Sequence, residues 1–204
     1  MDVAAIWDKM YGDSEYRYGT QPNAFVAEQA PQLLTPGARV LVVGDGEGRN
    51  GVWLAKQGFD VTTVDASVKG AAKSKALAAE LGVTMDIRVG LFPQATADCA
   101  PFDAVVLTFV HVPPPLRPGM HQAVMQALVP GGLVLLEGFR PEQRTLGRTS
   151  GGPPAVPPMF TEEMLRSDFE GLEIESLTSL TVTLDEGPGH SGLAEVLRLI
   201  ARRP

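Results

Sequence analysis

The chain has 204 residues, of which 44% are hydrophobic and 20% charged, a composition typical of a globular protein long enough to bury a full core. The formal net charge of -7 argues against nucleic acid or an anionic membrane as a binding partner. The single cysteine, Cys99, excludes an internal disulfide. No apolar stretch has the length of a signal peptide or a membrane span, so we expect a cytoplasmic protein.

All three tyrosines lie in residues 1–23, which are otherwise mostly polar. The pattern predicts a short helix at Val3–Met10 and a second helix at about Ala24–Leu34, which ends before a Pro-Gly pair. Aromatic rings with a polar end suit a partly hydrated site. Residues 1–23 are therefore expected either to cover a bound ligand, with Tyr18 close to the chemistry, or to tie the N-terminus to the core.

A strand, a glycine-rich turn, a helix and a second strand are predicted between Arg39 and Asp65. The run Arg39–Val43 is continuously apolar, which indicates a strand buried on both faces. A helix is expected from Arg49 to Gly58, and a second apolar strand, Asp60–Val64, leads to Asp65. The turn between the first strand and the helix contains three alternating glycines, Gly44, Gly46 and Gly48.

This turn predicts a binding site for a nucleoside derivative. Glycines let backbone N–H groups approach a ligand closely, and the N-terminus of the helix adds partial positive charge. Asp65 follows after about 20 residues, the spacing at which a carboxylate accepts hydrogen bonds from the hydroxyls of a ribose.

Two cofactor classes fit the glycines. Residues 46–51 satisfy the G-x-G-x-x-G pattern of dinucleotide-binding proteins, which is a weak signal in isolation. Residues 44–48 satisfy the G-x-G-x-G turn typical of proteins that bind S-adenosylmethionine. Because Gly44 follows the strand directly, the position of the turn favours S-adenosylmethionine.

Strands and helices continue to alternate after Asp65, which predicts a parallel sheet with helices on both faces. In the last of these helices Met120 and Val124 share an apolar face, and His121 is expected to point away from it. The predicted elements are a helix at Val68–Leu81 with Ser67 as its N-cap, strands at Val83–Val89, Phe102–Phe109 and Leu133–Leu136, and a helix at Gly119–Leu128.

The C-terminal part departs from this alternation. Residues 141–160 form a loop rich in glycine and proline, which is either a functional lid or a mobile insertion. A helix is predicted at Thr161–Phe169, followed by strands at Leu172–Leu184 and Leu193–Ala201, whose short connection indicates an antiparallel hairpin. Without repeats or a break in composition, residues 1–204 are expected to form one α/β domain with a Rossmann-like, mostly parallel sheet.

Several segments resemble the class I S-adenosylmethionine-dependent methyltransferases, most closely the small bacterial group related to tellurite-resistance and thiol methyltransferases. They are VLVVGDGEGRNGVWLAKQGFDVTTVDAS, FDAVVLTFVHVPP, LVPGGLVLLEGFRPEQ, EGPGHSG and the N-terminal WDKMY...YRYGTQPN. The resemblance implies seven strands in the order 3-2-1-4-5-7-6 with strand 7 antiparallel, helices on both faces, and S-adenosylmethionine as cofactor.

The resemblance also implies which residues contact the cofactor. The glycine turn would lie along the methionine and ribose, Asp65 on the ribose hydroxyls, and the residues after the second and third strands beside the adenine. The expected cofactor-binding residues are Gly44, Asp45, Gly46, Gly48, Asn50, Asp65, Ala66, Ser67, Gly90, Leu91, Phe92 and Thr108.

Two departures from the family pattern matter. Gly90 stands where the family commonly has an acidic residue that accepts from the adenine amino group, so adenine is expected to meet backbone groups of Gly90 and Leu91 instead. The fourth strand ends in Thr-Phe-Val-His rather than Asn-Pro-Pro-Tyr, which disfavours nucleic-acid bases and protein glutamine as methyl acceptors.

The expected partner is therefore a small-molecule acceptor such as a thiol or a tellurite- or selenite-like oxyanion, bound by a monomer or homodimer. A hydroxyl acceptor would need a general base. The candidate catalytic residues are His111, His190 with Glu186 nearby, and Tyr18. The three histidines lack the spacing of metal ligands, so no metal is expected. Two alternatives stay open: a cofactor-binding regulatory module without turnover and a small NAD-dependent oxidoreductase.

Overall fold

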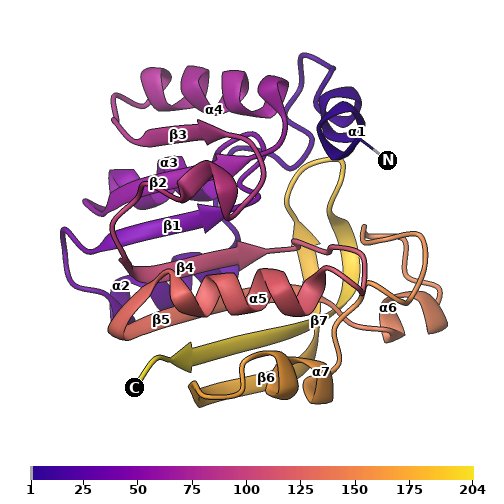
Figure 1. Cartoon of the computed structure of the whole chain (residues 1–204). Helices are drawn as coiled ribbons and strands as arrows, with labels where there is room; N and C mark the ends of the chain where they lie inside the picture. Colours follow the sequence, from indigo (N-terminus) through magenta and orange to yellow (C-terminus); the bar gives the residue numbers. More distant parts are fainter. Residues whose placement is uncertain (1) are drawn as a thin grey trace.

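The structure is a computed structural model that describes residues 2–204; Met1, the first residue of segment 1–23, lies outside the described residues. Seven strands form one sheet in the order β3-β2-β1-β4-β5-β7-β6 (Figure 1). Strand β7 is antiparallel to both of its neighbours, and the other pairings are parallel. This confirms the predicted fold class. The strands are β1 (Arg39–Val43), β2 (Asp60–Asp65), β3 (Asp86–Val89), β4 (Phe102–Thr108), β5 (Leu128–Phe139), β6 (Glu173–Asp185) and β7 (Ser191–Arg202).

Helices cover both faces of the sheet (Figure 1). Side chains of α2 and α3 share one core with the sheet, and side chains of α5 and α7 share the other. No helix in residues 2–204 is long and apolar enough to cross a membrane. The helices are α1 (Val3–Met10), α2 (Ala24–Leu33), α3 (Arg49–Lys56), α4 (Val68–Glu80), the 3₁₀ turn η1 (Gln94–Thr96), α5 (Arg117–Gln126), α6 (Glu142–Thr145) and α7 (Glu162–Asp168).

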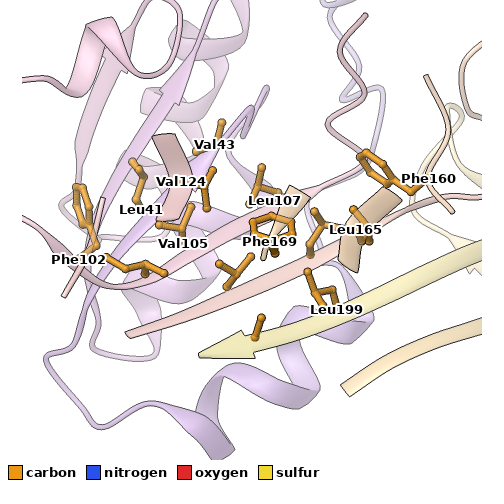
Figure 2. Packing of buried hydrophobic residues seen from close by; sticks show 14 of the residues in the cluster. Leu41, Val43, Phe102, Val105, Leu107, Val124, Phe160, Leu165, Phe169 and Leu199 are labelled. Atoms are coloured by element: carbon orange, nitrogen blue, oxygen red, sulfur yellow. The ribbon is translucent and has the colours of Figure 1, made fainter. Parts of the chain in front are cut away.

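The continuous hydrophobicity of β1 follows from this two-faced burial. Successive side chains of a strand point to opposite faces. Leu41 and Val43 therefore pack in the core under α5 and α7, which Figure 2 shows, while Val40 and Val42 pack in the core under α2 and α3. Both cores need apolar residues, so β1 shows no polar alternation.

The structure corrects several sequence-based boundaries. Strand β3 begins at Asp86 rather than at residue 83, β5 extends over Leu128–Phe139 rather than 133–136, and α5 begins at Arg117 rather than at residue 119. Helix α3 ends at Lys56 rather than at residue 58, β7 begins at Ser191 rather than at residue 193, and the short helix α6 lies within the predicted loop. Strand β5 is longer because its start pairs with β4 and its end pairs with β7, which local sequence does not reveal.

The expected orientation of His121 is also wrong. His121 is fully buried, and its Nδ1 lies 2.8 Å from Oδ2 of Asp168 in α7. Its ring stacks on Phe169, with centroids 4.7 Å apart. A histidine is tolerated at this position because a carboxylate from a distant helix satisfies one ring nitrogen.

We expect Phe169→Ala to lower the free energy of unfolding by about 3–5 kcal/mol, because the fully buried ring joins α7 to the core and its loss leaves a cavity. Urea denaturation followed by circular dichroism measures the change. Leu116→Ala is the control, since Leu116 is 63% exposed, and should change stability by less than about 0.5 kcal/mol. Equal effects of the two substitutions would contradict this assignment of the core.

Candidate active site

The glycine turn and Asp65 lie at the carboxyl ends of β1 and β2, where open α/β sheets bind ligands. Gly44, Gly46 and Gly48 all have positive φ, at 67°, 58° and 94°. Oδ2 of Asp65 accepts a hydrogen bond from the Gly46 N–H at 2.9 Å, and Oδ1 accepts one from the Ser67 N–H at 2.8 Å. A carboxylate has about four acceptor sites, so both oxygens retain capacity for a ligand.

Two polar residues of the expected cofactor set serve the fold in this structure. The buried Asp45 carboxylate accepts hydrogen bonds at 3.2 Å from the Gly51 N–H, within the first turn of α3. Asn50 accepts from the Asn23 N–H at 2.8 Å and donates to Oγ1 of Thr108 at 2.9 Å. Asn50 therefore joins the end of β4 to the entry of α2.

The expected adenine-binding residues only partly come together. Ala66, Gly90 and Leu91 line a cavity of about 240 Å³ at the ends of β2 and β3. Phe92 instead packs against the core under α5. The Gly90 N–H donates to the Asp65 carbonyl at 2.8 Å, so it is not available to an adenine.

Residues 2–23 cover the glycine turn. The Asp8 carboxylate in α1 accepts from Oγ of Ser67 at 2.6 Å and from the Lys69 N–H at 3.1 Å. The Tyr11 ring lies directly over Gly46, where an added Cβ would meet the tyrosine hydroxyl at 2.5 Å. The segment thus contacts the turns that follow both β1 and β2.

Glu47, inside the glycine turn, anchors the rest of this segment. Its buried carboxylate accepts from the Arg17 N–H at 2.8 Å and from Nζ of Lys73 at 2.7 Å. Glu47 was not predicted as a functional residue. A carboxylate between two glycines at a helix N-terminus was the available signal.

A buried polar network lies behind the turn. Nδ2 of Asn23 donates to Oε1 of Glu137 at 2.7 Å and to Oε1 of Glu186 at 3.0 Å. Nη2 of Arg49 donates to Oε2 of Glu186 at 2.9 Å, and Arg198 donates to Glu137. Nη1 of Arg49 is buried and has no hydrogen-bond partner within residues 2–204.

One residue of this network is conspicuous in the sequence. Glu137 interrupts the apolar run of β5, where a charged residue needs buried partners. The partner residues lie far away along the chain in other elements, so the network itself was not predicted.

His190 combines an oriented nitrogen with a free one. Nδ1 lies 3.2 Å from Oε2 of Glu186, and because a carboxylate accepts, Nδ1 carries the proton. Nε2 makes no hydrogen bond to the described chain and keeps a lone pair. The rings of Tyr18 and Phe109 both lie with centroids 4.4 Å from that of His190. Burial lowers the pKa of His190, so the ring is neutral at pH 7 and can accept a proton.

His111, the other candidate base, uses both ring nitrogens within the fold. Nδ1 donates to the Pro158 carbonyl at 2.9 Å, and Nε2 accepts from the Phe139 N–H at 3.0 Å. Burial lowers its pKa to about 4. With no free lone pair in this structure, His111 joins the end of β5 to the loop 141–160.

No group of three or more potential metal ligands occurs among residues 2–204. The candidate site consists of the glycine turn, Asp65, the Glu186–His190 pair and the aromatic rings around this pair.

Part of this chain is similar to known methyltransferases. Residues 40–132 match the family model of the methyltransferase domain. The matched segment runs from β1 into β5 and contains the glycine turn, Asp65 and the end of β4.

Two curated relatives carry methyltransferase names. Protein-L-isoaspartate O-methyltransferase of Gloeobacter violaceus is 34% identical over 135 residues, which are 63% of this chain and 62% of the relative. Ubiquinone biosynthesis O-methyltransferase of Caulobacter sp. is 38% identical over 102 residues, 49% of this chain and 40% of the relative. The chain thus spans less than two thirds of the length of these relatives.

Solved structures share the fold over almost the whole chain. A protein described for the conversion of a disulfide bond into a thioacetal group in echinomycin biosynthesis has a TM-score of 0.76 at 21% identity, covering 98% of this chain and 92% of that one. Magnesium protoporphyrin IX methyltransferase of Synechocystis, with bound SAH, has a TM-score of 0.68 at 18% identity, covering 98% and 93%. TehB of Haemophilus influenzae has a TM-score of 0.69 at 18% identity, covering 98% and 67%.

Asp45 should give the stability a pH dependence whose sign follows from its burial. Burial raises its pKa from 3.8 to about 7 in the folded protein. The contribution of Asp45 to the stability is therefore complete below 3.8, its pKa in the unfolded chain. This contribution is lost as the pH rises through about 7, its pKa in the folded protein. We expect Asp45→Asn to gain stability relative to the wild type by up to about 4 kcal/mol between about pH 4 and about pH 8.

Urea unfolding at a series of pH values measures this difference. The exposed Asp60 provides the control variant, Asp60→Asn. A stability difference between Asp45→Asn and the wild type that does not change with pH would contradict the burial of a titrating carboxylate.

Proposed function

We propose that the protein is an S-adenosylmethionine-dependent methyltransferase that methylates a thiol of a small acceptor. The main support for this proposal is the Glu186–His190 pair. The free Nε2 of His190 lies among aromatic rings, at the same end of the sheet as the glycine turn and Asp65. The matched methyltransferase domain and the methyltransferase names of the curated relatives support the reaction type.

The residues present fit the cofactor. Asp65 retains acceptor capacity for ribose hydroxyls, and the cavity beside Ala66 and Leu91 offers a place for the adenine. The buried, unpartnered Nη1 of Arg49, next to the glycine turn, suits the carboxylate of the methionine part. When bound, S-adenosylmethionine supplies a methyl group activated by a positively charged sulfur.

His190 prepares the acceptor. The thiol proton passes to Nε2, which leaves a thiolate as nucleophile and an imidazolium whose Nδ1–H is held by the Glu186 carboxylate. Although burial opposes it, the hydrogen bond from His190 and the charge of Arg49 lower the pKa of Glu186, so this carboxylate stays ionised. Methyl transfer is an in-line displacement, so the remaining task of the protein is to align the two reactants.

The environment of His190 favours an organic thiol over the alternatives. A thiol has a pKa of about 8.5, which is close enough to that of histidine for proton transfer. The pKa of an aliphatic hydroxyl is too high for this transfer. Tyr18, Phe109 and Phe139 surround the imidazole with apolar surface, which suits an organic molecule better than a hydrated tellurite or selenite ion.

Two covering segments support a small acceptor. Residues 2–23 place Tyr18 on one side of His190, and an added Cβ at Gly151 would lie 2.5 Å from Cδ2 of the imidazole. We therefore assign lid roles to segments 1–23 and 141–160 of a single catalytic domain. We further propose that the protein acts as a monomer or homodimer and without a nucleic-acid partner.

We expect His190→Gln to lower the rate of thiol methylation by about 10²–10⁴-fold, because the variant lacks the proton acceptor. The affinity for S-adenosylhomocysteine should stay within about threefold of the wild type. Transfer of label from S-adenosylmethionine to a panel of small thiols, their hydroxyl analogues, selenite and tellurite measures the rate and the preference. Glu186→Gln keeps a carbonyl acceptor for Nδ1–H but leaves the charge of Arg49 uncompensated, so it should lower both the activity and the stability.

The pH profile gives a second readout. Because burial lowers the pKa of His190, the acidic limb of kcat/KM should have its midpoint below 6.5, the ordinary histidine value. Full thiol methylation by His190→Gln, or methylation of the oxyanions alone, would overturn the proposed roles.

A further inference from the structure

The adenine end of the site has no acidic residue where the family pattern expects one, and the structure shows why residue 90 is glycine. Gly90 has a φ of 146°, which side-chain-bearing residues rarely adopt. A Cβ at this position would lie 2.9 Å from the Cβ of Ala95 in the loop that leads through η1. A carboxylate at residue 90 would therefore displace this loop.

A carboxylate reaches the same cavity from the N-terminal segment. Asp2, Val3 and Ala4 form one wall of the cavity of about 240 Å³, and Ala66, Gly90 and Leu91 form the other. Asp2 is the only charged residue among these lining residues. The side chains of Val3 and Leu91, 41% and 57% exposed, provide apolar surface beside it.

Only one of the two carboxylate oxygens of Asp2 accepts hydrogen bonds from the described chain. Its Oδ1 accepts from the N–H groups of Ala4 at 3.1 Å and Ala5 at 3.3 Å, so Asp2 is the N-cap of α1. Its Oδ2 makes no hydrogen bond within the described chain. The exocyclic amino group of adenine is a donor that a carboxylate oxygen can accept.

The position of α1 is fixed by contacts beyond this cavity. Asp8 accepts hydrogen bonds from Ser67 and Lys69, and Trp7 stacks on Tyr11 with ring centroids 5.4 Å apart. Figure 1 shows α1 beside α4, at the end of the sheet that holds the glycine turn. Asp2 is thereby held opposite the ends of β2 and β3.

We propose that Asp2 is the residue that selects adenine, by accepting a hydrogen bond from its amino group across the cavity. This inference rests on the proposed function, because it assigns the adenine of S-adenosylmethionine to the cavity. It also links cofactor binding to the lid, since the accepting oxygen belongs to α1. Binding of the cofactor then holds α1 in its docked position.

The test compares two ligands on two variants. S-Inosylhomocysteine differs from S-adenosylhomocysteine at the base, where a carbonyl replaces the amino donor. Asp2→Ser keeps an N-cap of similar strength but removes the free carboxylate oxygen. Asp13→Ser removes the same charge from an exposed position of the same segment and is the matched control.

By calorimetry, we expect Asp2→Ser to weaken S-adenosylhomocysteine binding by about 10-fold or more and to leave S-inosylhomocysteine binding unchanged. Asp13→Ser should behave as the wild type with both ligands. Hydrogen exchange gives a second readout: S-adenosylhomocysteine should slow exchange of the α1 amides in the wild type more than in Asp2→Ser.

The outcomes separate the two proposals. Equal weakening of both ligands by Asp2→Ser, or no weakening of either, would overturn the role of Asp2 while the cofactor assignment stands. Failure of the folded wild type to bind S-adenosylhomocysteine would overturn the proposed function and this inference with it.

Discussion

The arrangement of the site depends on the buried carboxylate of Glu186. It accepts hydrogen bonds from Asn23 and Arg49 and orients His190, so the N-terminal segment, the helix after the glycine turn and the β6–β7 hairpin meet at one side chain. Removing one partner of a buried ion pair typically costs about 3–5 kcal/mol, because the remaining charge loses its compensation. These three elements can therefore hold their positions only together.

This constraint explains how a mostly parallel sheet gains the proposed acceptor site. The hairpin is antiparallel, so its tip extends to the same end of the sheet as the glycine turn (Figure 1). There the Gly189 N–H donates to the Arg17 carbonyl at 2.8 Å. His190 is thus placed against Tyr18 from the N-terminal segment and Phe109 from the end of β4. Elements from both ends of the chain complete a site that the central β1–β2 unit begins.

Local features were predictable from the sequence and distant partnerships were not. Strand β1, the glycine turn, the Ser67 cap and the β6–β7 hairpin each follow from neighbouring residues, and the strand order followed from the family resemblance. Glu186 and His190 are four residues apart, so their pairing was visible. The partners of His111 and His121, Pro158 and Asp168, are each 47 residues away, and no periodicity indicates them.

The most direct test of the account is a calorimetric titration of the wild type and Asp65→Ala with S-adenosylhomocysteine and, separately, with NADH. Asp60→Ala, at the exposed start of the same strand, is the control. We expect micromolar binding of S-adenosylhomocysteine to the wild type and to Asp60→Ala, loss of that binding in Asp65→Ala, and no comparable binding of NADH. Preferential NADH binding, or S-adenosylhomocysteine binding that does not depend on Asp65, would contradict it.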